Sequence, residues 1–500
     1  MSVFSKSVTQ LAKGAGLAVF GKFAGRLLAV LGDIVAARVL GPSLFGLYAI
    51  GWTLLRIIGL LAHLGLPTGV LRYIPRYADD KAAVKNLINR SILIVAAVGV
   101  IVGGILYFGA PWLASNLYQK PLLTGIIRLF AFIIPLMSLL TLLSSISRSM
   151  QNMIYSVSVE DIGQPLLGLV LVVCIYLFAG PWLTGVILSD LVSYLVTGII
   201  CFFIVRKLFY SILITSGSSR VRISEVLAFS VPTALAGTFA VFVFWVDRLL
   251  VGYFLPASEN GIYQAVSQIS VLFVLVIAAF NAILAPIFAD LHSRRDVPQM
   301  QETYRVGTKW GLYISIPFFL VFCFAPAETL MVLYGAEYAG GWIALLVLTM
   351  GQLVNVATGS VGTLLSMAGY QRAWPGLSSA ALVLNILLCV LLIPRFGIMG
   401  AAIATSVSLS VMNFTGIIKA WFSLGVWPYD LRYLKGMFAA FCCLLVLGVL
   451  RIFYHGSALP FLSISTLLAV LVFFGLIILQ GLDDEDRNLL GLLRARILKE

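Results

Sequence analysis

Residues 91–110 read Ser-Ile-Leu-Ile-Val-Ala-Ala-Val-Gly-Val-Ile-Val-Gly-Gly-Ile-Leu-Tyr-Phe-Gly-Ala, a stretch of 20 positions without a charged side chain. A helix that crosses the hydrocarbon core of a bilayer needs about 20 apolar residues, so this stretch predicts a transmembrane helix. Apolar runs of similar length recur along the whole chain, and we expect each of them to span. They lie at residues 12–38, 44–66, 91–110, 122–146, 156–178, 183–204, 224–251, 261–288, 307–325, 341–366, 376–393, 398–422, 437–454 and 460–480.

The composition excludes a soluble globular protein. Of the 500 residues, 61% are hydrophobic and only 11% are charged, whereas a soluble chain is about half apolar and a quarter charged. The net charge of +13 is spread over many short loops and forms no single patch, so we expect no nucleic-acid partner. The six cysteines lie inside apolar runs without a CxxC pair, which supports neither a disulfide framework nor a metal site. The sequence predicts an all-α polytopic membrane protein with about 14 transmembrane helices.

Positively charged residues predict the orientation of these helices. When the loops are assigned alternately to the two sides, one side carries 23 Lys and Arg residues and the other carries 4. Because cytoplasmic loops are enriched in Lys and Arg, we expect both termini to be cytoplasmic and the protein to lie in the cell (plasma or inner) membrane.

The chain also repeats itself at an offset of about 215 residues. Asp33 is followed by Gly46-Leu47-Tyr48, and Asp247 is followed by Gly261-Ile262-Tyr263. Because six spans per repeat is an even number, the repeat is parallel, which predicts two six-helix lobes plus two C-terminal helices. The expected divisions are an N-terminal lobe (1–212), a C-terminal lobe (213–430), helices 13–14 (431–481) and a cytoplasmic tail (482–500), which is either an amphipathic surface helix or a solvated segment.

Charged residues within the spans are the candidates for function, because each costs about 2.5–3.5 kcal/mol at the centre of a membrane helix. Lys22 and Arg26 share one face of the first span with Asp33, and Arg56 shares a face of the second span with His63. The remaining cations within spans are Arg128, Arg248 and Lys419. We interpret Lys22, Arg26, Arg56, Arg128 and Arg248 as a basic cavity for an anionic head group such as a diphosphate. The alternative is a set of internal salt bridges, for example Arg26 with Asp33, or Asp247 with a cation of the first span.

Asp33, Asp247 and His63 are the candidates for coupling to an ion gradient. Asp190 and the Glu160-Asp161 pair are weaker candidates. Adjacent helical residues point about 100° apart, so this pair is not expected to form a carboxylate dyad, and its position near a helix end predicts ordinary solvation. Gly21 and Gly25 are spaced as in helices that pack closely.

One segment carries a strong family resemblance: Ala37-Arg-Val-Leu-Gly-Pro-Ser-Leu-Phe-Gly-Leu-Tyr48. The segments that support it are Arg72-Tyr-Ile-Pro-Arg-Tyr77, Leu333-Tyr-Gly-Ala-Glu-Tyr338 and Ile393-Pro-Arg-Phe-Gly-Ile-Met-Gly-Ala-Ala402. With these, the chain resembles the polysaccharide-transporter branch of the multidrug/oligosaccharidyl-lipid/polysaccharide exporter superfamily over nearly its whole length. Members of that branch have two six-helix lobes plus two further helices. They are flippases that move lipid-linked oligosaccharides from the cytoplasmic to the outer leaflet.

The resemblance implies polyprenyl-diphosphate-linked oligosaccharide as the substrate, with Lys22, Arg26 and Arg56 as the candidate basic cavity residues. It implies transport by alternating access without a cofactor, coupled to an H⁺ or Na⁺ gradient. The expected partners are membrane lipids and, among proteins, polysaccharide polymerases and glycosyltransferases.

Two other classes of function remain open. One is a cation-coupled multidrug exporter of the same superfamily, for which acidic and aromatic cavity residues are expected rather than this net basic set. The other is a membrane-embedded polysaccharide polymerase or glycosyltransferase. Such enzymes typically carry a large external loop with catalytic residues, and the longest expected external loop (326–340) is short. The sequence contains no HExxH or GxSxG motif and no supported pair of catalytic carboxylates, so we expect no catalytic site.

Overall fold

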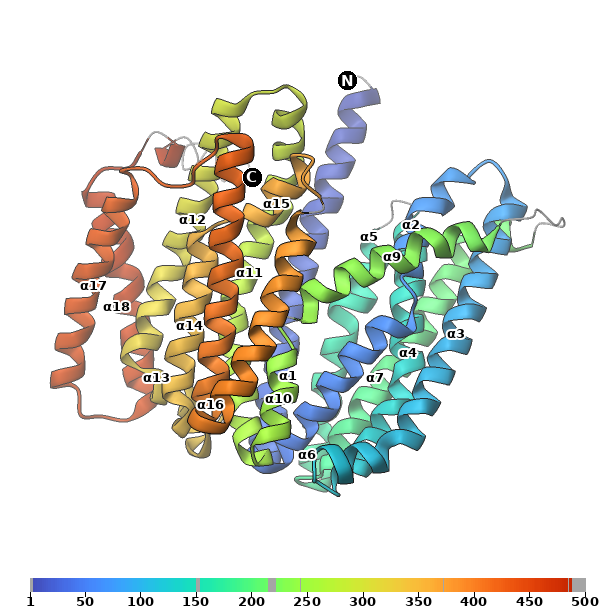
Figure 1. Cartoon of the computed structure of the whole chain (residues 1–500), viewed down its shortest axis with the longest axis horizontal. Coiled ribbons are helices and arrows are strands. Elements are labelled where there is room, and N and C mark those ends of the chain that lie inside the picture. The colour runs from blue at the N-terminus through green and yellow to red at the C-terminus, as the bar shows by residue number, and fades with distance from the viewer. Residues whose placement is uncertain are drawn as a thin grey trace. The chain divides into compact units, whose positions relative to one another are not determined.

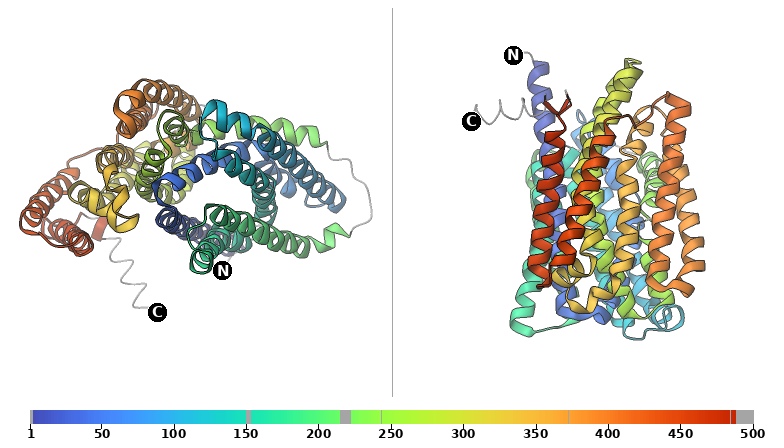
Figure 2. Two further views of the ribbon diagram at one scale, coloured as in Figure 1. Left: turned by 90° about the horizontal axis from the view of Figure 1, so that it is seen from below. Right: turned by 90° about the vertical axis from the view of Figure 1, so that its left-hand side faces the viewer.

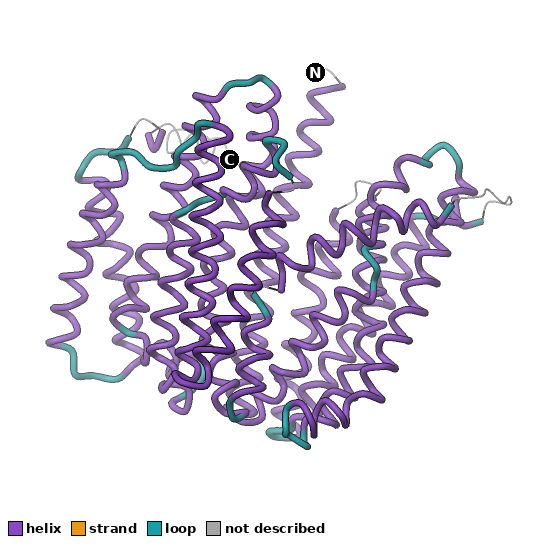
Figure 3. The backbone as a smooth tube through the Cα atoms, in the orientation of Figure 1, coloured by secondary structure: helices purple, strands orange, loops and turns teal. Residues whose placement is uncertain are grey.

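A computed structural model describes residues 3–149, 153–214, 222–242, 244–371, 373–483 and 485–487. These residues form helices joined by short loops, and no strand occurs among them (Figure 3). Eleven of the helical segments are long and apolar enough to cross a membrane. The protein is therefore a multi-pass membrane protein. Arg372 and most of the predicted tail (484 and 488–500) lie outside the described residues.

Two of the eleven segments each contain two of the expected spans. Helix α1 (Val3–Ala62) is broken at Gly41 and α16 (Ala373–Leu424) at Gly397, both of which have non-helical backbone angles. Counting each as two spans raises the total in the described chain to thirteen, and α9 (Ile223–Phe242) with α10 (Val246–Phe254) supplies the span expected at 224–251. The predicted fold class is confirmed.

The chain divides into two compact units. The first comprises the residues up to Ala265 together with Cys389–Ile398. Within it the long helices run alongside one another (Figures 1 and 2). After α1 its elements are α2 (Leu66–Arg76), α3 (Lys81–Trp112), η1 (Leu113–Leu117), α4 (Leu123–Ser149), α5 (Met153–Ser156), η2 (Val157–Gly163), α6 (Gln164–Ala179), α7 (Leu183–Leu208), α8 (Tyr210–Leu213), α9 and α10.

The second unit comprises Val266–Leu388 and Met399–Glu500. Helices α11 (Ala257–Ser293) and α16 belong to both units, because the division falls within each of them. The other elements of the second unit are α12 (Val297–Phe324), α13 (Pro326–Leu333), η3 (Ala336–Gly341), α14 (Trp342–Ala357), α15 (Val361–Met367), α17 (Tyr433–Phe453) and α18 (Ala458–Leu479). The α17–α18 hairpin packs against α12, where Phe473 contacts Tyr313 edge to face.

The boundary between these units differs from the boundary of the sequence repeat. Helices α9 and α10 and the start of α11 group with the first unit, although the repeat places them in the second lobe. The compact units are defined by contacts between residues, whereas the lobes are defined by the repeat in the sequence. The two divisions measure different properties, so the lobe boundary at residue 212 stays a prediction.

The break in α1 follows directly from its sequence. Gly41 has φ of 69°, a conformation that glycine adopts without a steric penalty, and Pro42 lacks the backbone N–H that would continue the helical hydrogen bonds. The chain therefore turns at Gly41-Pro42 and starts a new helix. This break lies inside the segment that carries the family resemblance.

The two glycines of the repeat motif lie face to face within the first unit. A Cβ atom added to Gly46 would lie 1.7 Å from the carbonyl oxygen of Ala257, and one added to Gly261 would lie 2.0 Å from that of Pro42. The side-chain amide of Asn260 donates a hydrogen bond to the Gly46 carbonyl (2.8 Å). The repeated glycines thus allow two backbones to touch where no side chain would fit.

Candidate functional site

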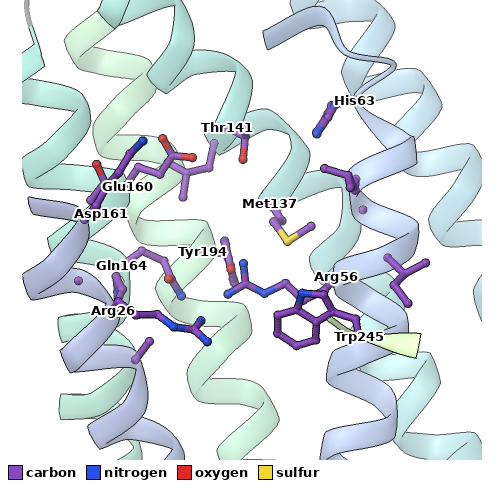
Figure 4. Close-up of a pocket in the computed structure, with 18 of the residues that line it drawn as sticks. Arg26, Arg56, His63, Met137, Thr141, Glu160, Asp161, Gln164, Tyr194 and Trp245 are labelled. Atoms are coloured by element: carbon purple, nitrogen blue, oxygen red, sulfur yellow. The ribbon is translucent and has the colours of Figure 1, made fainter. Parts of the chain in front are cut away.

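A cavity of about 390 Å³ lies among the membrane helices of the first unit (Figure 4). Its walls come from both halves of α1, from α4, η2, α6 and α7, and from the junction between α9 and α10. The residues that line it are Lys22, Gly25, Arg26, Ala29, Arg56, Ile57, Gly59, Leu60, His63, Met137, Leu140, Thr141, Glu160, Asp161, Gln164, Pro165, Tyr194, Phe242 and Trp245.

The structure brings four of the predicted site residues into this cavity. Lys22 and Arg26, which are four residues apart on the first half of α1, lie on one face of that helix. Arg56 on the second half of α1 and His63 just beyond its end complete the set. In Figure 4 the guanidinium groups of Arg26 and Arg56 point toward one another. Two spans that are separate in the sequence analysis therefore present their cations to a common space.

Arg56 has no counter-ion in direct contact in the part of the chain that the structure describes. Its guanidinium stacks 4.8 Å from the centre of the Trp52 ring, and its buried Nε atom has no hydrogen-bond partner among the described residues. Asp33 interacts electrostatically with Arg26, Arg56 and Arg248 from a position outside the cavity lining. Arg56 is a half-buried cation at a cavity wall, and its charge suits an anionic ligand.

Glu160 and Asp161 also line the cavity, which the sequence analysis did not predict. We expected solvation of both residues at a helix end. For Glu160 this expectation is wrong, because its side chain is only 23% exposed and pairs with Arg148 at 3.2 Å. Asp161 interacts electrostatically with Lys22 and Arg148. Five charged side chains therefore line the cavity, three cationic and two anionic.

A π-helical turn places these two carboxylates. Pro165 cannot donate the hydrogen bond that would return to the Asp161 carbonyl in an α-helix, and the backbone N–H of Gln164 bonds instead to Val159, five residues back. Gly25 of α1 packs against the Asp161 carbonyl, since a Cβ at Gly25 would lie 1.7 Å from that oxygen. Gly21 packs against the Val157 side chain, whose Cγ1 atom would lie 2.1 Å from an added Cβ. The predicted close packing at Gly21 and Gly25 is confirmed, and its partner is the turn η2. Such π-turns recur at functional sites.

His63 has a local structural role in addition to its place at the cavity. Its Nδ1 atom accepts a hydrogen bond from the backbone N–H of Gly65 (3.2 Å). A proton on Nδ1 would break this bond, so the neutral ring carries its hydrogen on Nε2. Its role in ion coupling stays a prediction.

The other predicted site residues lie outside the cavity lining. Arg128 packs 5.1 Å from the centre of the Tyr107 ring. Arg248 is 3% exposed, donates to the Phe244 carbonyl (2.9 Å) and stacks 4.5 Å from the centre of the Trp245 ring, so it stands behind a residue that lines the cavity. Asp247 accepts a hydrogen bond from the Tyr263 hydroxyl (2.7 Å). These assignments as ligands or coupling residues stay predictions.

The repeated tyrosine has the same kind of partner in both copies. Tyr48 donates its hydroxyl to Asp190 (2.8 Å), just as Tyr263 donates to Asp247. The repeat of Gly-x-Tyr was visible in the sequence, but Asp190 lies 142 residues from Tyr48 and no local pattern pairs them. Glu160, Asp161, Gln164 and Tyr194 were missed as cavity residues for the same reason, although Pro165 was a signal of irregular helix nearby.

The fold and the cavity together define a class of protein: a multi-pass helical membrane protein with a charged cavity between its spans. Within that class, the chain belongs to the polysaccharide biosynthesis protein family, whose model matches residues 11–292. It is similar to a probable low-salt glycan biosynthesis flippase of Haloferax volcanii, with 26% identity over 187 residues. The match covers 37% of this chain and only 38% of that relative's length.

Two solved structures show the same fold. The lipid II flippase MurJ in an inward closed conformation superposes with a TM-score of 0.68 at 17% identity, covering 92% of this chain and 97% of its own. An inward-facing multidrug resistance MATE family transporter of the MOP superfamily has a TM-score of 0.66 at 15% identity, covering 80% and 94%. The predicted family is confirmed, and the expectation that the chain is no enzyme agrees with the names of these relatives.

Proposed function

We propose that the protein is a flippase that moves polyprenyl-diphosphate-linked oligosaccharide from the cytoplasmic to the outer leaflet. One observation carries the proposal: Arg56, Arg26 and Lys22 converge on a cavity inside the membrane region, and Arg56 lacks a direct counter-ion among the described residues. A diphosphate supplies the missing negative charge with several acceptor oxygens. The lipid tail stays in the bilayer while the head group enters the cavity.

Alternating access is the proposed mechanism, with both termini in the cytoplasm. The first half of α1 runs from Lys22 at the cavity to the break at Gly41, a rise of about 29 Å and hence nearly the hydrocarbon thickness. Just beyond that break, the Gly46–Gly261 contact joins backbone to backbone. In this mechanism the Gly46–Gly261 contact closes the end of the substrate path that faces the outer leaflet. The contact opens when the head group is released to that leaflet.

An H⁺ or Na⁺ gradient resets the cycle in this proposal. Asp33 is the best placed coupling residue, because it interacts electrostatically with both Arg26 and Arg56. A proton or sodium ion at Asp33 removes negative charge next to the cations and thereby changes their hold on a diphosphate. Asp247 and His63 are the further candidates. Polymerases and glycosyltransferases that make or use the glycan are the expected protein partners.

The second candidate is a cation-coupled multidrug exporter, and one observation favours it: a MATE family transporter shares the fold. That likeness concerns the fold alone. The cavity carries three cations against two carboxylates, one of which is already paired with Arg148, so it suits an anion better than a cationic drug.

The test is a deletion strain whose lipid-linked glycans are extracted and identified by mass spectrometry. We expect polyprenyl-diphosphate oligosaccharide to accumulate and surface polymer to be lost, which would also identify the glycan. An unchanged lipid pool together with new drug sensitivity would contradict the flippase and favour the exporter.

A further inference from the structure

We propose that the turn η2 is a sugar-binding subsite, in which Asp161 and Gln164 hydrogen-bond to the hydroxyls of the first sugar attached to the diphosphate. The inference rests on the proposed function and adds a determinant of substrate selectivity within the same cavity.

The carboxylates of the cavity need an explanation that a diphosphate does not provide. Glu160 and Asp161 would repel an anionic head group, yet both line the cavity that holds Lys22, Arg26 and Arg56. Glu160 is accounted for by its ion pair with Arg148. Asp161 has no ion pair within 4 Å and accepts no hydrogen bond among the described residues, so its acceptor oxygens are available to a ligand.

Gln164 provides a second available acceptor on the next turn. Its amide nitrogen donates to the Ser193 hydroxyl (3.1 Å), which fixes the orientation of the amide. The carbonyl oxygen accepts no hydrogen bond within the part of the chain that the structure describes. Sugar hydroxyls are donors as well as acceptors, and carboxylate and amide oxygens are the acceptors that suit them.

The backbone holds Asp161 at a fixed place beside the turn of α1 that carries Lys22 and Arg26. Gly25 touches the carbonyl of Asp161 and lies between Lys22 and Arg26 on α1. The contact that fixes η2 is therefore made by the same helix turn that presents two of the cations. In Figure 4, Glu160 and Asp161 lie further along the cavity from Trp245 and the guanidinium of Arg56, so a ligand with phosphate at one end and sugar at the other matches both ends.

The size of the cavity limits how much of a ligand it can bind. A volume of about 390 Å³ is near the lower end of the usual range of about 300–1,000 Å³ for ligand pockets. It accommodates a diphosphate with the first sugar and leaves the rest of an oligosaccharide outside. We therefore infer selectivity for the first sugar and tolerance of the later ones.

The test compares two probes on the full-length protein in lipid nanodiscs: polyprenyl diphosphate without sugar, and the same lipid carrying glucose or N-acetylglucosamine. For the wild type we expect one sugar-bearing lipid to bind about tenfold more tightly than the bare lipid, as two net hydrogen bonds provide. Asp161→Ala should abolish this preference while binding the bare lipid as tightly or more tightly, because a negative charge near Lys22 is removed.

The ratio of the two affinities separates this subsite from a merely neutralising Asp161. If Asp161 only neutralises the charge of Lys22, Asp161→Ala strengthens binding of both probes equally. The ratio of the two affinities then stays unchanged, and the proposed sugar-binding subsite is wrong. Asp161→Asn keeps one acceptor and should retain part of the preference, and it serves where the alanine variant folds poorly. Glu225→Ala, an exposed carboxylate outside the cavity, is the matched control and should change neither affinity.

Two wild-type outcomes distinguish the subsite from the proposed function. Binding of both probes without a preference for any of the tested sugars would contradict the subsite and leave the diphosphate site standing. Failure to bind either polyprenyl diphosphate would contradict the flippase itself.

Discussion

Two cations, the buried Lys309 in the second unit and the half-buried Arg56 in the first, differ in how their charge is matched. The side chain of Lys309 is 1% exposed, and its Nζ atom lies 3.1 Å from Asp483, 3.3 Å from Glu485 and 3.0 Å from Asp486. Arg56 has an aromatic ring beside it and no carboxylate within 4 Å among the described residues. The first charge is satisfied by the protein and the second is not.

This difference distinguishes a charge that stabilises the fold, Lys309, from a charge that is available to a ligand, Arg56. Burying an ion is costly unless other charges and hydrogen bonds compensate for it. Around Lys309, the segment after α18 brings the compensation, and Lys435 and Arg432 extend the network by pairing with Asp483 and Glu485. At Arg56 the compensation is incomplete and a cavity lies beside the cation. The comparison predicts that loss of Lys309 harms stability, whereas loss of Arg56 harms transport.

The largest expected effect is that of Lys309→Met on stability. Three carboxylates would lose their common cation, and breaking a buried pair costs about 3–5 kcal/mol. We expect a clear fall in the unfolding temperature of the purified protein in detergent, measured by intrinsic fluorescence. Lys435→Met, whose side chain is 32% exposed, is the matched control and should cost less. Equal unfolding temperatures for Lys309→Met and the wild type would remove the structural role.

Arg56→Ala should reduce export about 10- to 100-fold, the loss expected for charge-assisted hydrogen bonds of about 1.5–3 kcal/mol. The amount of protein in the membrane should be unchanged, because no protein ion pair is broken. Arg56→Lys should retain part of the activity, and Lys22→Ala should have a smaller effect, because Lys22 is exposed. Export of lipid-linked glycan in a complemented deletion strain measures all three. Full export by both Arg56→Ala and Lys22→Ala would mean that the cavity is not the substrate site.

Gly46→Ala tests the backbone contact beyond the break in α1. The new methyl group would meet the Ala257 carbonyl, and relief of such overpacking costs about 1–3 kcal/mol. We expect the closed outer end to be destabilised, so that a cysteine introduced beside the contact becomes more reactive to a membrane-impermeant maleimide. Gly104→Ala, with open space around its Cα, is the control. Unchanged labelling of the Gly46→Ala variant would show that the contact does not close the outer end.

The sequence predicts the spans well, and three of its five candidate cations, Lys22, Arg26 and Arg56, line the cavity. It predicts the partners of charged residues poorly, for a physical reason. The length of an apolar run and the repeated Gly-x-Tyr motif can both be recognised in consecutive residues. The apolar runs therefore predicted the helices, and the repeated motif predicted that the same local structure occurs twice. Whether a cation is matched depends on residues far away: Asp483 lies 174 positions from Lys309.

The smallest expected effect is the pH dependence of the Lys309 cluster. Burial alone would raise the pKa of the Asp483 carboxyl, but hydrogen bonds from Lys435 and Lys309 outweigh it and hold the pKa below the usual 3.8. A carboxyl with a lowered pKa stabilises the folded state above pH 3.8, and this stabilisation disappears as the pH falls through the folded-state pKa. The difference in unfolding temperature between the wild type and Asp483→Asn should therefore be constant from about pH 8 to pH 5. It should begin to fall near pH 3.8 and disappear only below the lower folded-state pKa. A difference that already declines between pH 7 and pH 5 would mean that these ion pairs do not hold Asp483 in its charged form, and that the contrast with Arg56 is weaker than the geometry indicates.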